Sequence, residues 1–435
     1  MTRRRMTLWG GRFADRLSDE AFAYTVDLAD RRLLSFDLAG SIAHVEMLGA
    51  TGIIAAAEAR TIREGLERIA AEDFEFVDGD EDVHSAVERR LIELVGEVGE
   101  KLHTGRSRND QIALDLRLYL RAAAVGRRND LAELIGALTD QAELHADTAI
   151  PTYTHLQQAQ PSTLGQHLLA HGWALSRDRE RLLDLDRRLA ESPLGAGASA
   201  GSILSLDPAQ TAAALGFASS FVNSLDAVGS RDVAAEFGFV LTQAMVNLSR
   251  LAEELVLWAT SEFGWLSLSD AYATGSSALP HNKNPDVAEL VRGRTASAIG
   301  HLNALLVLQK GLPLTYNRDL QEDKPALFWL DDTLASSCGA LAGVIRTATF
   351  HPPAPSPVTE ALGIAENLVR RGVPFRTAHA AVGKLVALLD GRPFTEASAD
   401  VLDAAGVQSA DLVVRPPQAG RSVADQVASL RSSTS

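Results

Sequence analysis

Apolar residues recur at helical spacing through much of this chain. The clearest run has apolar positions in alternating steps of four and three residues: Leu241, Met245, Leu248, Ala252, Leu255 and Ala259. This spacing is typical of a heptad seam, along which one helix packs against others. Ile299, Leu302 and Leu306 form a similar stripe on the next segment.

The positions of proline support long helices. No proline precedes Pro151, and the stretches 209–279 and 286–312 also contain none. Proline in a helix interior costs about 3 kcal/mol, so proline-free stretches favour helices well above the usual length of about 10–14 residues. No segment alternates apolar and polar residues with hairpin turns between, so strands should be minor. The predicted fold class is all-α.

The seam is longer than one globular subunit usually needs. We therefore expect a bundle of long helices that is shared between subunits, and the alternative is a large monomeric all-α protein.

Composition excludes several classes of protein. With 41 basic and 56 acidic residues the formal net charge is 41 − 56 = −15, which argues against a general nucleic-acid binder. The single cysteine, Cys338, excludes an internal disulfide and any cysteine-cluster metal site. The chain contains no run of 18 apolar residues, so no membrane span is predicted. Arg3, Arg4 and Arg5 are not followed by a long apolar segment, so we expect a cytoplasmic protein.

Two further motifs have ordinary explanations. The segment 194–201 is nearly a dinucleotide-binding fingerprint, but residues 190–193 before it do not look like a strand, so a tight backbone turn is favoured. His167 and His171 have the spacing of a helical metal pair, but no HExxH pattern surrounds them, which favours ordinary histidines on a helix face. We expect no cofactor and no metal.

Four polar segments at helix ends are stronger candidates. Residues 103–111 crowd two arginines, two hydroxyls and two side-chain amides around a glycine turn, a set that suits carboxylates. Residues 154–157 hold a histidine that is either a general acid or base or a structural hydrogen-bonding residue. Residues 274–286 form a loop too long for a simple bundle connection. Residues 311–324 alone are more typical of a solvated turn, but a bundle can bring such ends together.

Together these segments resemble the argininosuccinate lyase family of the aspartase/fumarase superfamily. The resemblance runs in order through nearly the whole chain and is carried by residues 8–13, 81–84, 103–111, 154–157, 223–228, 274–292, 316–324 and 368–375. The GRSRNDQ and YNRDxQEDK stretches are specific to this family rather than to the superfamily.

The resemblance implies three helical regions: an N-terminal domain at 1–105, a central long-helix bundle at 106–356 and a small C-terminal domain at 357–435. It also implies a homotetramer in which each active site takes loops from three subunits. The implied partners are a small dicarboxylate or amino-acid substrate, with no nucleic acid and no membrane.

The implied reaction is carbon–nitrogen bond cleavage in arginine biosynthesis, which eliminates fumarate from argininosuccinate and leaves arginine. A base removes a proton beside a succinyl carboxylate, and the resulting doubly charged aci-carboxylate must be stabilised before the bond breaks.

By motif position, Ser276 corresponds to the family's base, His155 to an acid or charge partner, and Thr154 to a residue at the succinyl group. The implied substrate-binding residues are Asp82, Ser107, Arg108, Asn109, Gln157, Asn282, Lys283, Asn284, Tyr316, Gln321 and Lys324.

The chain departs from the family pattern at several positions: near residues 24–26, where the family usually has small hydroxyl residues, and at Leu279, His281 and Asn282 of the signature loop. The departure at Asn282 matters most. The family loop reads GSSxMPQKKNP, and Asn282 stands where its first lysine stabilises the aci-carboxylate, while Lys283 keeps the second. Loss of one such stabiliser typically costs roughly 10²–10³ in rate. Three hypotheses follow: an argininosuccinate lyase, an enzyme with another N-succinyl substrate or a non-eliminating outcome such as cyclisation, or an inactive homologue.

Overall fold

The computed structural model describes residues 17–27, 29–415 and 420–434. Residues 8–13, which carry part of the family resemblance, and the three arginines at 3–5 lie outside the described residues.

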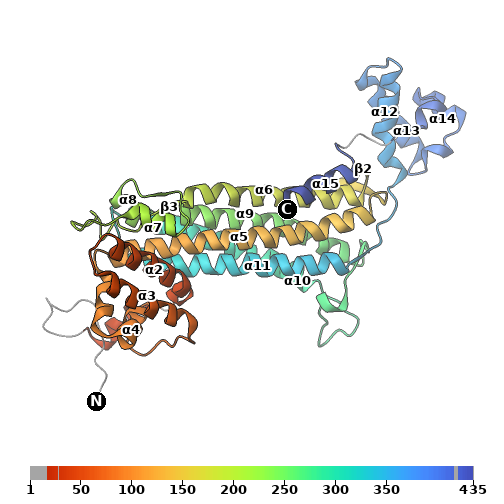
Figure 1. The fold of residues 1–435 in the computed structure, drawn as a ribbon. Coiled ribbons are helices and arrows are strands. Elements are labelled where there is room, and N and C mark those ends of the chain that lie inside the picture. Colours follow the sequence, from red (N-terminus) through yellow and green to blue (C-terminus); the bar gives the residue numbers. More distant parts are fainter. Residues whose placement is uncertain (1–16, 28, 416–419, 435) are drawn as a thin grey trace. The chain divides into compact units, whose positions relative to one another are not determined.

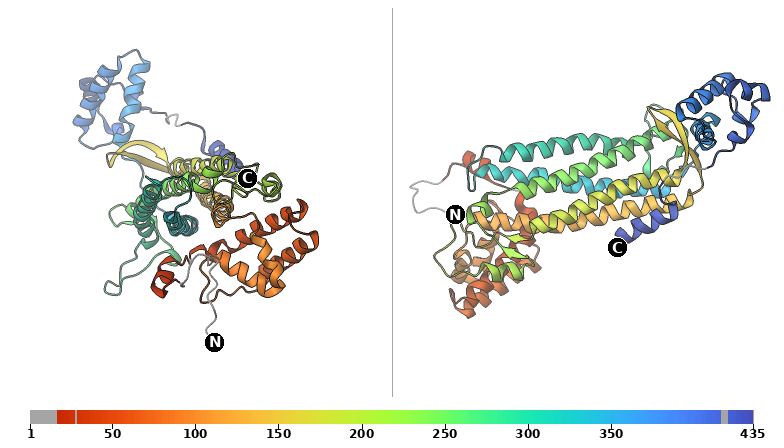
Figure 2. Two further views of the ribbon diagram at one scale, coloured as in Figure 1. Left: turned by 90° about the vertical axis from the view of Figure 1, so that its left-hand side faces the viewer. Right: turned by 90° about the horizontal axis from the view of Figure 1, so that it is seen from above.

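Long helices dominate the described structure, as the sequence predicted. They are α5 (Arg108–Leu144), α6 (Leu164–Leu189), α9 (Asp232–Ala259), α10 (Asp286–Gln309) and α11 (Asp323–Thr347). Their lengths of 37, 26, 28, 24 and 25 residues confirm the expectation of helices above average length. Figures 1 and 2 show them as extended rods. The all-α prediction is confirmed.

The chain forms two compact units, and every long helix contributes to both. The first unit contains residues 1–128, 179–244 and 295–335, and the second contains residues 129–178, 245–294 and 336–435.

In the first unit, short helices pack around an apolar core that includes Leu48, Ile62, Leu66 and Leu91. The shorter elements are α1 (Asp19–Thr25), η1 (Ala29–Leu33), α2 (Leu34–Ala50), α3 (Ala56–Ala71), α4 (Val83–Val95), η2 (Gly96–His103), β3 (Glu191–Ser192), α7 (Pro208–Ala214), β4 (Ser219–Ser220), α8 (Ser224–Gly229) and η4 (Arg318–Glu322). The two short strands pair in parallel.

The glycine-rich segment at 194–201 is a tight turn, as expected. Gly195 and Gly197 have φ angles of 104° and 64°, and a Cβ on Gly197 would lie 2.7 Å from the carbonyl oxygen of Gly201. The expectation that no strand precedes the turn was wrong, because β3 ends at Ser192. The turn opens no helix directly, since α7 begins only at Pro208, so it is not a dinucleotide-binding unit.

In the second unit, a hairpin and a compact C-terminal cluster accompany the long-helix segments. The shorter elements are β1 (Ala149–Thr154), β2 (Gln157–Thr163), β5 (Leu266–Ser267), η3 (Asp270–Tyr272), β6 (Thr349–Phe350), η5 (Pro357–Glu360), α12 (Ala361–Arg370), α13 (Phe375–Leu389), η6 (Phe394–Glu396), α14 (Ala399–Ala405), η7 (Ser409–Leu412) and α15 (Val423–Thr434). The pairs β1–β2 and β5–β6 are antiparallel. Ile364, Leu368, Leu385 and Phe394 belong to the core of the C-terminal cluster.

The two apolar stripes predicted from the sequence have different surroundings. Leu241, Met245 and Leu255 of the α9 seam are completely buried. On α10, by contrast, Ile299 is 52% exposed and Leu306 is 54% exposed. The chain therefore covers the first stripe itself and leaves much of the second uncovered.

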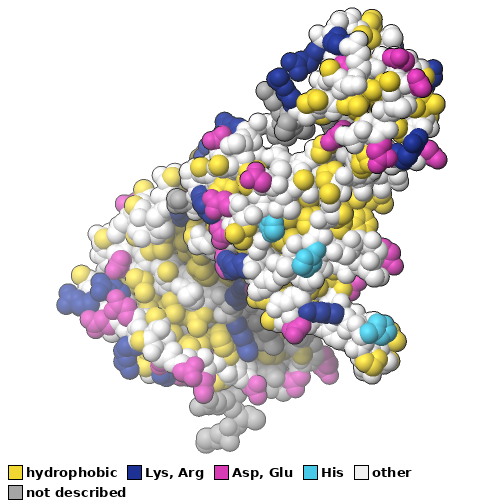
Figure 3. Space-filling model, turned by 90° about the vertical axis from the view of Figure 1, so that its right-hand side faces the viewer, with side chains coloured by type: hydrophobic (Ala, Val, Ile, Leu, Met, Phe, Trp, Pro, Cys, Tyr) yellow, Lys and Arg dark blue, Asp and Glu magenta, His cyan; other side chains and the backbone are white. Residues whose placement is uncertain are grey.

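None of the described helices is long and apolar enough to cross a membrane. On the face drawn in Figure 3, basic and acidic side chains are interspersed among uncharged ones.

Asp110 connects the start of α5 to the glycine turn. Its fully buried carboxylate accepts hydrogen bonds from the backbone N–H groups of Gly195 at 3.0 Å, Gly197 at 2.8 Å and Ser107 at 2.9 Å. We predict that Asp110→Ala lowers the free energy of unfolding by roughly 2–4 kcal/mol, because it leaves these donors unpaired. Urea denaturation followed by circular dichroism measures the change.

Asp110→Asn is the matched variant, because its amide oxygen can still accept from the turn and the loss should be smaller. If Asp110→Ala unfolded at the same urea concentration as the wild type, the carboxylate would not hold this turn.

Candidate active site

A pocket of about 230 Å³ lies in the first unit. It is lined by three groups of residues that are far apart in sequence: Asp27, Asp30, Glu81 and Asp82; Arg108, Asn109 and Ile112; Tyr316, Arg318, Gln321 and Lys324. Six of these were predicted from the sequence to bind substrate, namely Asp82, Arg108, Asn109, Tyr316, Gln321 and Lys324. Folding therefore brings the predicted 81–84, 103–111 and 316–324 segments to one cavity.

The start of α5 positions Arg108 and Asn109. Ser107 precedes the helix, and its Oγ accepts from the backbone N–H of Asn109 at 3.2 Å. The side-chain amide of Asn109 donates to the carbonyl oxygen of Ala198 at 2.9 Å. Ser107 itself does not line the pocket but caps the helix end that does.

Arg108 is held on one wall by Asp82. Its Nε lies 3.1 Å from Asp82 Oδ2, and one of its terminal nitrogens donates to Gln111 Oε1 at 2.9 Å. Asp82 also begins α4, since its Oδ1 accepts from the backbone N–H of Ser85 at 2.7 Å. Burial opposes ionisation of Asp82, but the Arg108 and His84 cations outweigh it and lower the pKa of this carboxyl.

Lys324 is a buried cation on the opposite segment. Its Nζ lies 2.8 Å from Asp27 Oδ2 and 3.6 Å from Asp323 Oδ1, and it donates to the carbonyl oxygen of Gln321 at 3.0 Å. Burial alone would lower the pKa of Lys324, but the two carboxylates raise it, so the ammonium keeps its charge. Asp323 is paired in turn with the buried Arg231 at 2.7 Å.

The remaining wall adds a phenol and a second guanidinium. Burial raises the pKa of Tyr316, which therefore stays a neutral donor near pH 7. Arg318 donates to the carbonyl oxygen of Thr25 at 2.6 Å and lies 3.2 Å from Glu81 Oε1. The pocket thus presents charges of both signs, which suits a zwitterion better than a simple anion.

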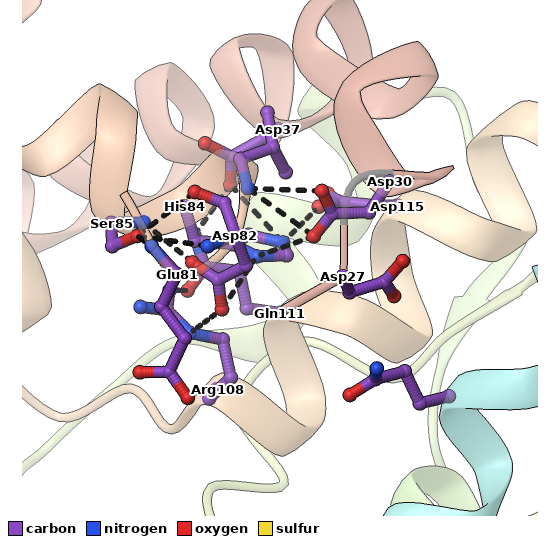
Figure 4. Close-up of polar contacts among 12 residues, drawn as sticks. Asp27, Asp30, Asp37, Glu81, Asp82, His84, Ser85, Arg108, Gln111 and Asp115 are labelled. Atoms are coloured by element: carbon purple, nitrogen blue, oxygen red, sulfur yellow. Dashed lines mark hydrogen bonds and ion pairs between the residues drawn. The ribbon is translucent and has the colours of Figure 1, made fainter. Parts of the chain in front are cut away.

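His84 lies behind the pocket within a ring of carboxylates (Figure 4). Its side chain is completely buried, and its Nε2 is 2.8 Å from Asp115 Oδ2. Asp82, Asp30 and Asp37 lie 3.6, 3.9 and 3.9 Å from its ring nitrogens.

This ring of acids determines the charge of the imidazole. Burial and the Arg108 cation oppose protonation of His84, but Asp37, Asp115 and Asp82 raise its pKa to about 10. Burial also raises the pKa of both Asp30 and Asp115 to about 7. His84 is therefore a buried imidazolium that supports Asp82 from behind.

Thr154, His155 and Gln157 lie at the exposed end of the β1–β2 hairpin in the second unit. His155 and Leu156 occupy its two central turn positions with φ angles of 55° and 57°. Non-glycine residues rarely adopt this conformation, and for a bulky leucine it is an outlier, so the turn stores strain. Such strain is found most often where a side chain must be presented at a functional site.

Ser276, Asn282, Lys283 and Asn284 lie on the loop before α10. Thr274 and Asn284 close its base by exchanging backbone hydrogen bonds of 3.2 and 2.8 Å. The Oγ of Ser276 accepts from the backbone N–H groups of Ala278 and Leu279 at 3.2 and 3.0 Å. These donors favour negative charge on that oxygen.

Lys283, the lysine that the loop retains, forms an ion pair outside the loop. Lys283 Nζ lies 2.6 Å from Asp270 Oδ1, on the exposed surface of the second unit. The backbone N–H of Asn282 donates to the carbonyl oxygen of Leu279 at 3.1 Å and closes a turn. Among the described residues, no hydrogen bond or ion pair joins this loop to the hairpin tip, so a single chain does not connect these two candidate groups.

Comparison with known proteins identifies the family. Residues 14–300 match the family described as Lyase, and residues 358–417 match the family described as Argininosuccinate lyase C-terminal. The argininosuccinate lyase of Desulforudis audaxviator is 50% identical over 402 residues, covering 89% of this chain and 87% of that protein. The argininosuccinate lyase of Synechococcus sp. (strain JA-3-3Ab) is 51% identical over 389 residues, covering 87% of this chain and 80% of that protein.

The chain belongs to the argininosuccinate lyase family.

Solved structures agree with this membership. An EDDS lyase in complex with formate superimposes with a TM-score of 0.77 at 29% identity, covering 95% of this chain and 83% of that one. Class II fumarase from Schistosoma mansoni has the same TM-score at 15% identity, covers 92% of each chain, and shows the shared fold alone. Like other members of the argininosuccinate lyase family, the chain is a lyase.

Sequence reasoning missed several residues of the pocket region. Asp27 precedes η1 and Asp30 lies in its first turn, and acidic residues are ordinary at a helix start, so no local pattern marked them. His84 belongs to a motif of the argininosuccinate lyase family, but nothing in the sequence showed that Asp37 and Asp115 would surround it.

The charge of His84 predicts how stability changes with pH. Its folded pKa of about 10 exceeds the unfolded value of about 6.5, so its contribution is fully present below pH 6.5 and is lost as pH rises to about 10. We predict that His84→Gln unfolds more easily than the wild type at pH 6.5, by about 3–5 kcal/mol, because the acidic cluster around the imidazole loses its buried cation. The difference in unfolding free energy between His84→Gln and the wild type should be smaller at pH 10.

Urea denaturation of both proteins at the two pH values tests this, with His379→Gln on the exposed face of α13 as the control. A difference that stayed constant between pH 6.5 and 10 would mean that His84 is neutral in the folded protein.

Proposed function

We propose that this chain is a carbon–nitrogen lyase that eliminates fumarate from argininosuccinate and releases arginine. The observation that carries the proposal is the convergence of six predicted substrate residues, from three distant segments, on one pocket with charges of both signs. The family membership supports the same reaction.

The pocket's chemistry suits the amino-acid end of argininosuccinate. Lys324 and Arg318 can pair with the α-carboxylate, and the Tyr316 hydroxyl and Gln321 amide can donate to it. Asp27 and Glu81 offer carboxylates to the α-ammonium group. A zwitterion can therefore replace part of the pairing that these side chains now make with each other.

The remaining predicted residues are assigned to the succinyl end. Arg108 can form a two-pronged contact with a carboxylate, and Ser107, Asn109 and Asn284 supply neutral hydrogen bonds. Thr154 and Gln157 at the hairpin tip are assigned to the same end of the substrate.

Ser276 acts as the base and His155 as the acid or charge partner. Ser276 takes the proton from the carbon beside a succinyl carboxylate, and the electron pair moves into that carboxylate. The aci-carboxylate then expels the guanidine nitrogen, which gains a proton as the carbon–nitrogen bond breaks. The two amides that donate to Ser276 Oγ stabilise its deprotonated form, which an isolated serine would not reach.

These groups meet, we propose, in a homotetramer of three-region subunits divided at 1–105, 106–356 and 357–435, each site using loops from different subunits. Phe239, Ile299 and Leu306 are each about half exposed, and Phe239 and Leu306 line one groove between α9 and α10. Apolar faces of this kind are covered when long helices associate. A cytoplasmic location stays a prediction, compatible with the single, buried cysteine Cys338.

Light scattering should therefore give a mass close to four chains at micromolar concentration. Phe239→Glu combined with Leu306→Glu should yield smaller species and reduce lyase activity. A matched pair of glutamates at the exposed positions Val125 and Leu183 is the control. A wild-type protein that remained a monomer at this concentration would contradict both the assembly and the shared site.

Asn282 allows a direct test of the reaction. A neutral amide stands where the argininosuccinate lyase pattern has a lysine, so we predict that Asn282→Lys raises argininosuccinate cleavage by about tenfold or more by stabilising the aci-carboxylate. Fumarate release by both proteins measures the effect, with thermal melts as the folding control.

The outcomes separate the three hypotheses. Fast wild-type cleavage that Asn282→Lys does not improve would assign the charge to another group, such as Lys283 or His281. Slow cleavage that a well-folded Asn282→Lys leaves slow would favour another N-succinyl substrate or cyclisation. No activity in either protein on any N-succinyl compound would favour an inactive homologue.

A further inference from the structure

Three potential metal ligands meet between α6 and α9 in the second unit. His167 and His171 lie four residues apart on α6, so their rings share one helix face. The Nε2 atoms of these two histidines lie 2.6 and 2.8 Å from the same carboxylate oxygen, Oε2 of Glu254 on α9. The sequence supplied the histidine pair, but only the fold adds the third ligand from 83 residues away.

We propose that His167, His171 and Glu254 form a binding site for a first-row divalent transition metal, Zn²⁺ above all, with solvent as the fourth ligand. Two imidazoles and one carboxylate are ligands that Zn²⁺, Co²⁺ and Ni²⁺ accept readily, whereas Mg²⁺ and Ca²⁺ prefer oxygen alone. The three ligand atoms all lie within 4.8 Å of one another.

The geometry requires little movement. In a tetrahedral zinc site with bonds of about 2.0–2.1 Å, neighbouring ligand atoms are about 3.3 Å apart. The two imidazole–carboxylate distances would therefore open by about 0.5–0.7 Å as the ion replaces the two hydrogen-bonding protons. Both histidines remain on one helix throughout, so their spacing is already fixed.

Neighbouring side chains hold the three ligands in place but leave them accessible to an ion from solvent. The ring of His167 packs against Trp258, with ring centroids 5.1 Å apart. The side chains of His171 and Glu254 are 13% and 34% exposed. An ion can therefore enter from solvent and keep a water ligand, and a bound ion would link α6 to α9.

Two other groups of described residues have ligand atoms equally close together, and both contain His84. They are poor cation sites, because His84 is completely buried and protonated there, and Arg108 lies beside Asp82. The buried Cys338 offers no competing exposed thiolate. Among these groups, the His167–His171–Glu254 cluster is the one whose three side chains are all partly exposed, so that an ion can reach it from solvent.

The test uses the full chain without a polyhistidine tag, stripped with a chelator and titrated with Zn²⁺ and with Co²⁺ in a calorimeter. We expect one saturable site per chain, a melting temperature that rises with Zn²⁺, and no competition from Mg²⁺ in excess. Bound Co²⁺ should show visible absorption bands of a four- or five-coordinate nitrogen and oxygen site.

Variants assign the ligands. His171→Ala and Glu254→Gln should each weaken Zn²⁺ binding by about tenfold or more, while His379→Ala, an exposed histidine elsewhere in this unit, should leave it unchanged. Glu254→Gln keeps the size and one hydrogen-bonding oxygen, so circular dichroism should show it folded. Absence of saturable Zn²⁺ binding, or equal affinity in the folded His171→Ala or Glu254→Gln variants, would overturn the proposal.

Discussion

The cost of burying charge organises the first unit of this protein. Asp37, Asp110 and Asp115 are all buried, and an isolated carboxylate in such surroundings would be strongly destabilising. Each has at least one oxygen that is hydrogen-bonded by a group from elsewhere in the chain: His84 for Asp115, the glycine turn for Asp110 and Gln111 for Asp37. The pocket is possible because this polar network fixes the first turns of α4 and α5, which carry Asp82 and Arg108.

The same network separates supporting residues from binding residues. His84 is shielded from the pocket and supplies positive charge from behind, so Asp82 can stay ionised while it holds Arg108. On the other wall, the carboxylate of Asp323 forms ion pairs with both Arg231 and Lys324, and it supports Lys324 in a similar way. The charged side chains that line the pocket are thus held in place by a second layer of charged side chains behind them. A substrate therefore meets binding groups that are already oriented.

The second unit presents its candidate groups outward. The strained hairpin tip with His155 and the loop with Ser276 and Asn282 protrude without contacting each other in one chain. Exposed apolar side chains on the parts of α9 and α10 that belong to the first unit suggest how such protruding groups could still act together: other subunits could cover these faces and bring the groups into one site. A protein that leaves these faces uncovered can complete both its core and its active site through association, which would make catalysis depend on assembly.

The sequence alone determined the helical class, the long helices and most of the candidate site. The apolar spacing along α9 and the absence of proline are local signals that can be read without knowing the tertiary structure. The GRSRND and YNRDxQEDK motifs identified their residues as candidates directly. The tertiary structure decided which distant groups meet. Asp27 joining Lys324, Asp115 facing His84 and Glu254 closing on His167 and His171 all depend on how helices pack. No local pattern encodes such contacts, because each is made between segments tens to hundreds of residues apart.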